Sequence, residues 1–158
     1  MERLADLISR HAQDGRLARI LLRPERLAAP VAVDAAEIAA RGLTGDHARP
    51  GKRAVTLIQA EHLAVIGACL GRDAIPPELL RRNLVVSGLN LSALKGRQLA
   101  IGGAVLRLMT VCAPCSRMEA ALGHGGYSAM RGHGGWCAEV LTPGRIAPGD
   151  AVRPLSEE

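Results

Sequence analysis

The apolar positions of this 158-residue chain recur mostly with the spacing of β-strands. Short apolar or alternating runs, bounded by turns that contain glycine or proline, predict seven strands. They lie at residues 17–22, 54–59, 83–86, 98–101, 104–111, 136–141 and 150–153. Many short strands with few helices and no regular βαβ alternation predict a mainly β fold, an antiparallel barrel or sandwich with peripheral helices.

Helical spacing occurs in three places. A short amphipathic helix is predicted at residues 2–11, where apolar side chains are three and four positions apart. A second helix carries apolar residues on one face from Leu63 to Leu70 and stops at Gly71. A third is predicted at residues 116–122. No domain boundary is visible, and a chain of this length with 48% apolar residues can fill the core of a single domain.

The composition favours a small anionic ligand. The formal charge is +5, and all but two of the 20 basic residues are arginine, which recognises phosphate and carboxylate groups through two parallel hydrogen bonds. The chain has no Phe, one Tyr and one Trp, which argues against a nucleic-acid platform built on stacked bases. The amino-terminal segment lacks the apolar core of a signal peptide, and no apolar run could span a membrane. We expect a cytoplasmic protein with no membrane partner.

The segment Cys112-Ala113-Pro114-Cys115 joins the strand at 104–111 to the helix at 116–122. This order places the Cys115 thiol at a helix amino terminus. Unpaired backbone N–H groups there, together with nearby Arg117, favour thiolate over thiol. A thiolate is both a nucleophile and a ligand for soft metals, so Cys115 is the candidate catalytic residue.

Three other interpretations of this segment stay open. Cys112 and Cys115 could form a thioredoxin-like redox pair, although that motif follows a strand in a βαβ unit, which the pattern here lacks. A zinc site would need Cys112 and Cys115 together with His124 and His133, at spacings unlike those of ordinary zinc fingers. The simplest hypothesis for Cys69, Cys112 and Cys137 is that they are structural.

Two further patches could bind an anion. Gly42–His47 forms a glycine-containing turn in which Asp46 and His47 precede Lys52 and Arg53 at a strand entrance. The second patch, Arg81-Arg82-Asn83, presents two guanidinium groups and an amide at the start of another strand.

Taken together, these segments resemble the MOSC domain, which occurs at the carboxyl terminus of molybdenum-cofactor sulfurases and as small stand-alone bacterial proteins. The resemblance covers residues 16–154, leaving an amino-terminal helix within 1–15 and a tail at 155–158. Its carriers are the segments 42–47, 53–63, 81–89, 99–102, 112–115, 144–146 and 149–150. It implies a barrel-like β fold in which the cysteine of the Pro-Cys step, here Cys115, contacts the metal of a molybdenum cofactor or carries sulfur.

The resemblance also implies a binding role for polar residues around the pterin phosphate. They correspond to Arg53, Arg81, Asn83 and Arg117, with Thr110 on the strand that leads to the thiol and Asp46 and His47 in the first patch. Short bacterial members include reductases of N-hydroxylated compounds. Pyridoxal phosphate needs a Schiff-base lysine in a dedicated site, and with only Lys52 and Lys95 we expect no such site on this chain.

Three functions follow as hypotheses. The first is a molybdenum-dependent oxidoreductase that reduces N-hydroxylated small molecules with Cys115 as metal ligand. It needs an external electron-donor protein, because the sequence has no flavin, haem or iron–sulfur motif. The second is a sulfur carrier or transferase with a Cys115 persulfide, supplied by a sulfur-donor protein. The third is a non-enzymatic domain that binds an anionic ligand. A monomer or a homodimer is expected.

Overall fold

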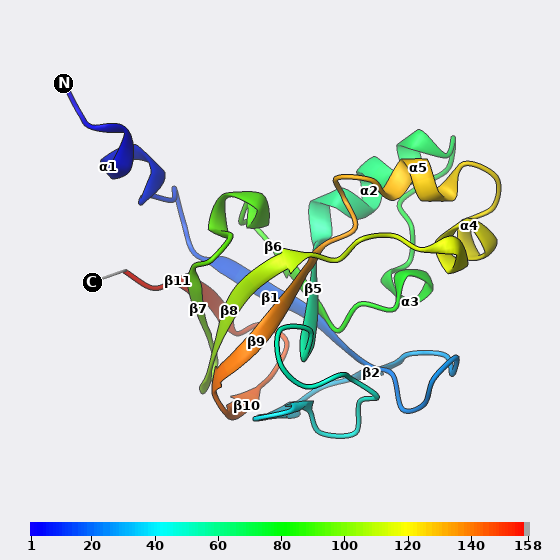
Figure 1. Ribbon diagram of the computed structural model, residues 1–158, viewed down its shortest axis with the longest axis horizontal. Helices are drawn as coiled ribbons and strands as arrows, with labels where there is room; N and C mark the ends of the chain where they lie inside the picture. Colours follow the sequence, from blue (N-terminus) through cyan, green and yellow to red (C-terminus); the bar gives the residue numbers. More distant parts are fainter. Residues whose placement is uncertain (157–158) are drawn as a thin grey trace.

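A closed β-barrel forms the body of the protein, and the computed structural model describes residues 1–156 of it (Figure 1). Seven strands follow one another around the barrel in the order β11-β7-β8-β9-β5-β6-β1, and a β11–β1 pairing closes it. β2 extends the sheet beyond β1. The strands are β1 (Gly15–Leu22), β2 (Val31–Val33), β5 (Val55–Gln59), β6 (Leu84–Ser87), β7 (Gln98–Ile101), β8 (Ala104–Val111), β9 (Trp136–Thr142) and β11 (Ala151–Pro154).

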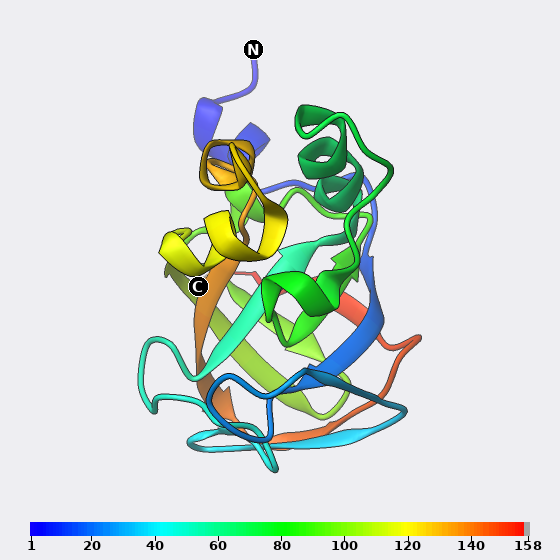
Figure 2. The ribbon, with the colours of Figure 1, turned by 90° about the vertical axis from the view of Figure 1, so that its right-hand side faces the viewer.

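The two ends of the barrel are covered differently (Figure 2). Helices gather over one end, and a small antiparallel sheet of order β10-β3-β4 lies at the other. That sheet consists of β3 (Ala36–Ala39), β4 (Gly42–Leu43) and β10 (Gly144–Ile146). The helices are α2 (Ala60–Cys69), α3 (Pro77–Leu80), α4 (Ser116–Leu122) and α5 (Gly126–Met130), and a 3₁₀ turn, η1, spans Leu91–Leu94.

The predicted mainly β class is confirmed, with one difference in strand direction. All seven predicted strands are present, and β7 and β8 have the predicted bounds. β5 and β6 are parallel, however, because α2 and α3 carry the chain back between them in one βαβ crossover. The barrel is therefore mixed rather than wholly antiparallel. The sequence pattern missed β2, β3, β4 and β10, whose two to four residues are too short to show a period.

Aliphatic side chains fill two layers of core. Inside the barrel, Leu17, Leu57 and Leu84 are fully buried. Alternate residues of the same strands, such as Ile58 and Val85, point outward and pack against the helices. The first four residues of β5 are consequently buried on both faces, and this explains why apolar residues there are not confined to alternate positions.

The amino-terminal helix stands apart from the barrel. α1 (Leu4–Ile8) is shorter than the predicted 2–11, and its apolar residues Leu4, Leu7 and Ile8 are all exposed. Figure 1 shows it projecting away from the body. The predicted tail at 155–158 lies outside the described residues from position 157 on. Within residues 1–156, no helix combines the length and apolar character needed to cross a membrane.

The chain at Gly135, just before β9, approaches β5 closely, and a substitution can test this approach. The φ of Gly135 is +94°, and a Cβ there would lie 2.1 Å from the carbonyl oxygen of Leu57 on β5. We expect Gly135→Ala to lower the free energy of unfolding by about 2–4 kcal/mol, because left-handed strain and a backbone clash add together. Urea titration measures this. Gly132→Ala is the control, since Gly132 also has positive φ but faces open space; equal losses in the two variants would contradict the close approach.

Candidate functional site

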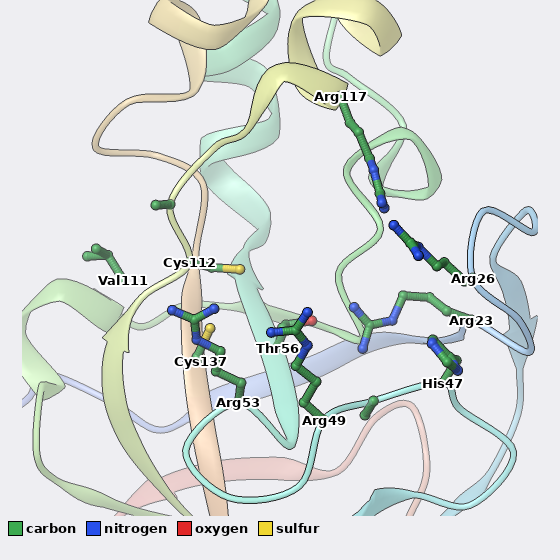
Figure 3. Close-up of a pocket in the computed structure, with 12 residues that line it drawn as sticks. Arg23, Arg26, His47, Arg49, Arg53, Thr56, Val111, Cys112, Arg117 and Cys137 are labelled. Carbon is green, nitrogen blue, oxygen red and sulfur yellow. The ribbon is translucent and has the colours of Figure 1, made fainter.

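A cavity of about 470 Å³ lies beside β5, β8 and β9, between loops 23–30 and 44–54 and the start of α4 (Figure 3). Half of its lining residues are arginine or histidine, and none of the described residues that line it is acidic. Its volume falls within the range of small-molecule sites. The lining residues are Arg23, Arg26, His47, Ala48, Arg49, Arg53, Thr56, Val111, Cys112, Ala113, Arg117 and Cys137.

A buried carboxylate fixes one of the lining arginines. The Asp46 side chain is fully buried, and its two oxygens accept hydrogen bonds from Nε and Nη2 of Arg23 at 3.2 and 2.9 Å. The backbone N–H of Arg23 also donates to Asp46, at 2.6 Å. This contact joins the glycine-containing turn at 42–47 to the end of β1. Asp46 therefore holds Arg23 against the cavity floor instead of lining the cavity itself.

Asn83 extends the same network beneath the floor. It is completely buried, and its Oδ1 accepts hydrogen bonds from the backbone N–H and the hydroxyl of Thr56, both at 3.1 Å. Its Nδ2 donates to Asp46 and to the carbonyl oxygen of Leu21, also at 3.1 Å. Each polar atom of the amide thus has a partner, which removes the penalty for its burial. Asn83 ties β1, β5 and β6 together where the cavity begins.

Arg82 anchors the cysteine segment from the other side. It is 7% exposed, and its guanidinium donates to the carbonyl oxygens of Gly134, Leu80 and Cys112 at 2.7, 2.9 and 3.4 Å. The backbone N–H of Cys112 donates to Gly135 across the strand pair at 2.8 Å. These bonds fix the chain at the point where β8 ends, so the Cys112 side chain is held at the cavity wall.

Cys112 and Cys137 form a pair of thiols on this wall, and Figure 3 shows both sulfur atoms at the cavity. Hydrogen bonding with Cys137 lowers the pKa of Cys112 to about 6, and the charges of Arg82, Arg23 and Arg53 act in the same direction against the effect of burial. The same hydrogen bond and burial raise the pKa of Cys137. Cys112 is therefore the more acidic thiol of the pair.

The structure brings only some of the predicted site residues to the cavity. Arg53, Arg117 and His47 line it. Asp46 and Asn83 lie beneath it and hold its floor. The other three predicted residues, Arg81, Thr110 and Cys115, are not among the residues that line it.

Arg81 faces loop 23–30, where its guanidinium donates to the carbonyl oxygens of Ala28 and Glu25. Burial and the charges of Arg23 and Arg117 lower the pKa of Arg81. Thr110 pairs with Cys137 across β8 and β9. Cys115 is the residue before α4; it is exposed and lies on the chain between the cavity residues Ala113 and Arg117.

Sequence reasoning missed Arg23, Arg26, Arg49, Thr56 and Cys137 as cavity residues. The three arginines lie in loops with no motif of their own, and only the fold brings those loops together. Thr56 lies inside an apolar strand. For Cys137, alternation along β9 relative to Cys112 could have indicated a shared face, but only once the β8–β9 pairing was known.

The positions of the cysteines and histidines bear on the zinc-site and redox-pair interpretations. Within residues 1–156, no group of three or more His, Cys, Asp or Glu side chains could hold a metal ion, so the four residues that a zinc site would need are not assembled. His133 instead packs edge-on against His62, with ring centroids 5.1 Å apart. All four cysteines are free thiols, and Cys112 associates with Cys137 rather than Cys115. Cys69 is exposed at the end of α2.

Comparison with known proteins places this geometry in a family context. A family model described as MOSC domain matches residues 15–153. Among solved structures, the YuaD protein from Bacillus subtilis superimposes with a TM-score of 0.80 at 19% identity, covering 92% of this chain and 98% of that one. YiiM from Geobacillus stearothermophilus gives 0.76 at 16% identity, covering 90% and 75%. YiiM from Escherichia coli gives 0.72 at 20% identity, covering 90% and 71%. At these identities the likeness concerns the fold. None of the curated proteins matches the sequence.

The rate of Cys112 alkylation should report its lowered pKa. Because the thiolate is the reactive form, labelling by neutral iodoacetamide should reach half its maximal rate near pH 6. Cys137→Ala removes the hydrogen bond, so the midpoint should move to higher pH and labelling at pH 6 should slow. Peptide mass spectrometry follows Cys112 separately from the other thiols. A wild-type midpoint at the ordinary thiol pKa would show that the thiol pair does not exist in solution.

Replacing Asp46 should show how much its buried contact with Arg23 contributes to the free energy of unfolding. Asp46→Asn leaves Arg23 charged and 15% exposed without its carboxylate, so the free energy of unfolding should fall by about 3 kcal/mol. Glu37→Gln is the control, because Glu37 faces Arg145 at 4.0 Å in an exposed pair, and it should cost less than about 1 kcal/mol. Urea unfolding compares the two. Similar small losses would mean that the buried pair contributes little.

Proposed function

Because the chain belongs to the MOSC domain family, as its motifs predicted, we propose that it binds the molybdenum cofactor and reduces N-hydroxylated small molecules. The observation that carries this proposal is the cavity itself, where five arginines and a histidine meet free cysteine thiols within about 470 Å³. A phosphorylated, metal-bearing cofactor needs two kinds of group: guanidinium groups that bind the phosphate and thiolates that bind the metal.

The residues present suit the anionic part of the cofactor. Arg49 and Arg53 come from loop 44–54 and Arg117 from the first turn of α4, and all three are exposed at the cavity, so their guanidinium groups can orient a phosphate. Arg23 is already held by Asp46, which makes it a fixed positive charge at the floor. A phosphate in this position would also relieve the mutual repulsion of the arginines.

Cys115 is the proposed metal ligand. It lies between two cavity residues on the chain and is exposed, so a metal at the cavity mouth can approach its sulfur. Cys112 is already engaged with Cys137. One protein thiolate would be enough, because the cofactor brings sulfur ligands of its own. The cofactor would supply the two-electron removal of oxygen, which no side chain here can perform.

The chain's own groups perform the supporting tasks. Thr56 and Arg23 are fixed by Asn83 and Asp46, so the cavity floor is organised before any ligand binds. His47 lies at the edge of the cavity, where it could exchange a proton with a substrate. The electrons come, in this proposal, from an external donor protein. The exposure of Cys115 also favours the second candidate, a sulfur carrier, because a partner could deliver sulfur to it.

Metal and pterin analysis of protein made in cofactor-synthesising cells tests the proposal. Wild-type protein should contain molybdenum and pterin in near-equimolar amounts. Arg53→Ala should lower pterin retention by roughly tenfold or more, because a charge-assisted phosphate contact is worth about 1.5–3 kcal/mol. Arg72→Ala removes an exposed arginine that does not line the cavity and should retain the cofactor.

The same analysis separates the candidate functions. Cys115→Ser should lose molybdenum, whereas Cys69→Ser, which removes another exposed thiol, should keep it. Wild-type protein without molybdenum but with cyanide-labile sulfur on Cys115 would favour the sulfur carrier. Protein with neither would leave only the binding of some other anion and would overturn the proposed reductase.

A further inference from the structure

The Cys112–Cys137 pair is not needed to bind the cofactor in the proposed function, yet it is placed for chemistry of its own. Thr110 and Cys137 are opposite each other on β8 and β9, and Gly135 is bonded to Cys112. Cys112 and Cys137 are therefore diagonal neighbours on the same face of the strand pair. Both side chains line the arginine-rich cavity, and the interaction between their thiols lowers the pKa of Cys112 and raises that of Cys137.

The surroundings of this pair select the charge of what can reach it. Arg23, Arg49, Arg53 and Arg117 line the same cavity, and Arg82 lies behind Cys112. No described lining residue carries a negative charge. A cavity of one sign concentrates ligands of the opposite sign and repels those of its own. Small anions therefore have preferred access to the two sulfur atoms.

We propose that Cys112 and Cys137 are a redox-active dithiol that exchanges with small anionic disulfides admitted to the arginine cavity. This activity goes beyond the proposed function and does not depend on a bound cofactor. In this proposal the partner of Cys112 is Cys137 on the neighbouring strand. The Cys-x-x-Cys spacing would instead indicate Cys115.

The exchange takes two steps. The Cys112 thiolate attacks one sulfur of the disulfide RS–SR, forming a mixed disulfide and releasing RS⁻. Cys137 passes its proton to that RS⁻, and its sulfur attacks the Cys112 sulfur, releasing a second RS⁻. The small disulfide is reduced by two electrons to two thiols once the second RS⁻ takes up the proton that Cys112 had lost on ionisation. The Cys112–Cys137 pair loses the same two electrons and becomes a disulfide.

The fold assigns the two roles. Cys112 is the more exposed of the two and supplies the attacking sulfur, which the lowered pKa of its thiol favours, whereas Cys137 is buried and reacts in the second step. Cys137 is 4% exposed, so it is reached from the Cys112 side and not from bulk solvent. It is the resolving cysteine.

Closing the bond requires a small movement of Cys112. Diagonal strand neighbours have Cα atoms about 7–8 Å apart, slightly more than the 4.4–6.8 Å usual for a disulfide. Cys112 is the first residue after β8, and the bonds from its N–H to Gly135 and from Arg82 to its carbonyl oxygen would have to lengthen as it moves. A bond formed against this geometry is easily reduced, so the exchange should be reversible.

A pair of probes that differ in charge tests the proposal on cofactor-free protein. 3,3′-Dithiodipropionate is a dianion, and cystamine is a dication of similar size. The dianion should oxidise the pair at least about tenfold faster, and the preference should shrink in high salt. Arg49→Ala should reduce it, whereas Arg72→Ala, which removes an exposed arginine away from the cavity, should not. Equal rates for the two probes would overturn the selection by charge.

Peptide mapping identifies the bond. Wild-type and Cys115→Ser proteins should both form a Cys112–Cys137 disulfide that dithiothreitol reverses. Cys137→Ser should stop at a mixed disulfide on Cys112. Protection of both thiols from alkylation in oxidised wild-type protein gives the same answer without any variant. A Cys112–Cys115 bond, or no bond in wild-type protein, would overturn the proposal while leaving the cofactor hypothesis untouched.

Discussion

The buried contact between Asp46 and Arg23 is the constraint on which the cavity depends. Asp46 lies in a turn that the small sheet β3–β4 brings against the barrel, and its carboxylate is closed off from solvent. Through Asn83 it is connected to Thr56 and to three barrel strands. A buried carboxylate with fewer partners would be costly, so loop, strand and arginine have to assemble together.

This arrangement places a strong positive field over two kinds of thiol. Cys115 is exposed beside α4, whereas Cys112 and Cys137 face each other on the cavity wall. The clustered arginines repel one another until an anion binds, so ligand binding and stability are coupled at this end of the molecule. The same field that suits a phosphate also favours the Cys112 thiolate. Cofactor binding and thiol exchange would thus share one electrostatic origin.

Local sequence patterns were sufficient for most of the fold. β8 was predictable because it is a mostly apolar run that follows a Gly-Gly turn, and α2 because its apolar face ends at a glycine. The parallel direction of the β5–β6 pair could not be predicted in this way, since it depends on the crossover between the strands and not on the sequence of either strand. β3 and β4 were too short to show a period, although they carry the turn that delivers Asp46.

Fewer of the site residues could be predicted from local sequence patterns. Arg53, Arg117 and His47 were found because they stand in motifs, and they line the cavity. Arg81 occurs in a motif too, but its left-handed backbone aims the guanidinium at loop carbonyls. Arg26 and Arg49 have no local signal, because loops distant in sequence meet only after the barrel closes. The Cys112–Cys137 pair likewise depends on strand register.

The central claim is that one thiolate at the rim of an arginine cavity holds a molybdenum cofactor. The most direct measurement is a crystal structure of the cofactor-loaded protein with anomalous data collected at the molybdenum edge. One strong anomalous peak should be bonded to the sulfur of Cys115, with phosphate density among Arg49, Arg53 and Arg117. A peak bonded to Cys112 or remote from the cavity, or phosphate density away from these arginines, would contradict this claim.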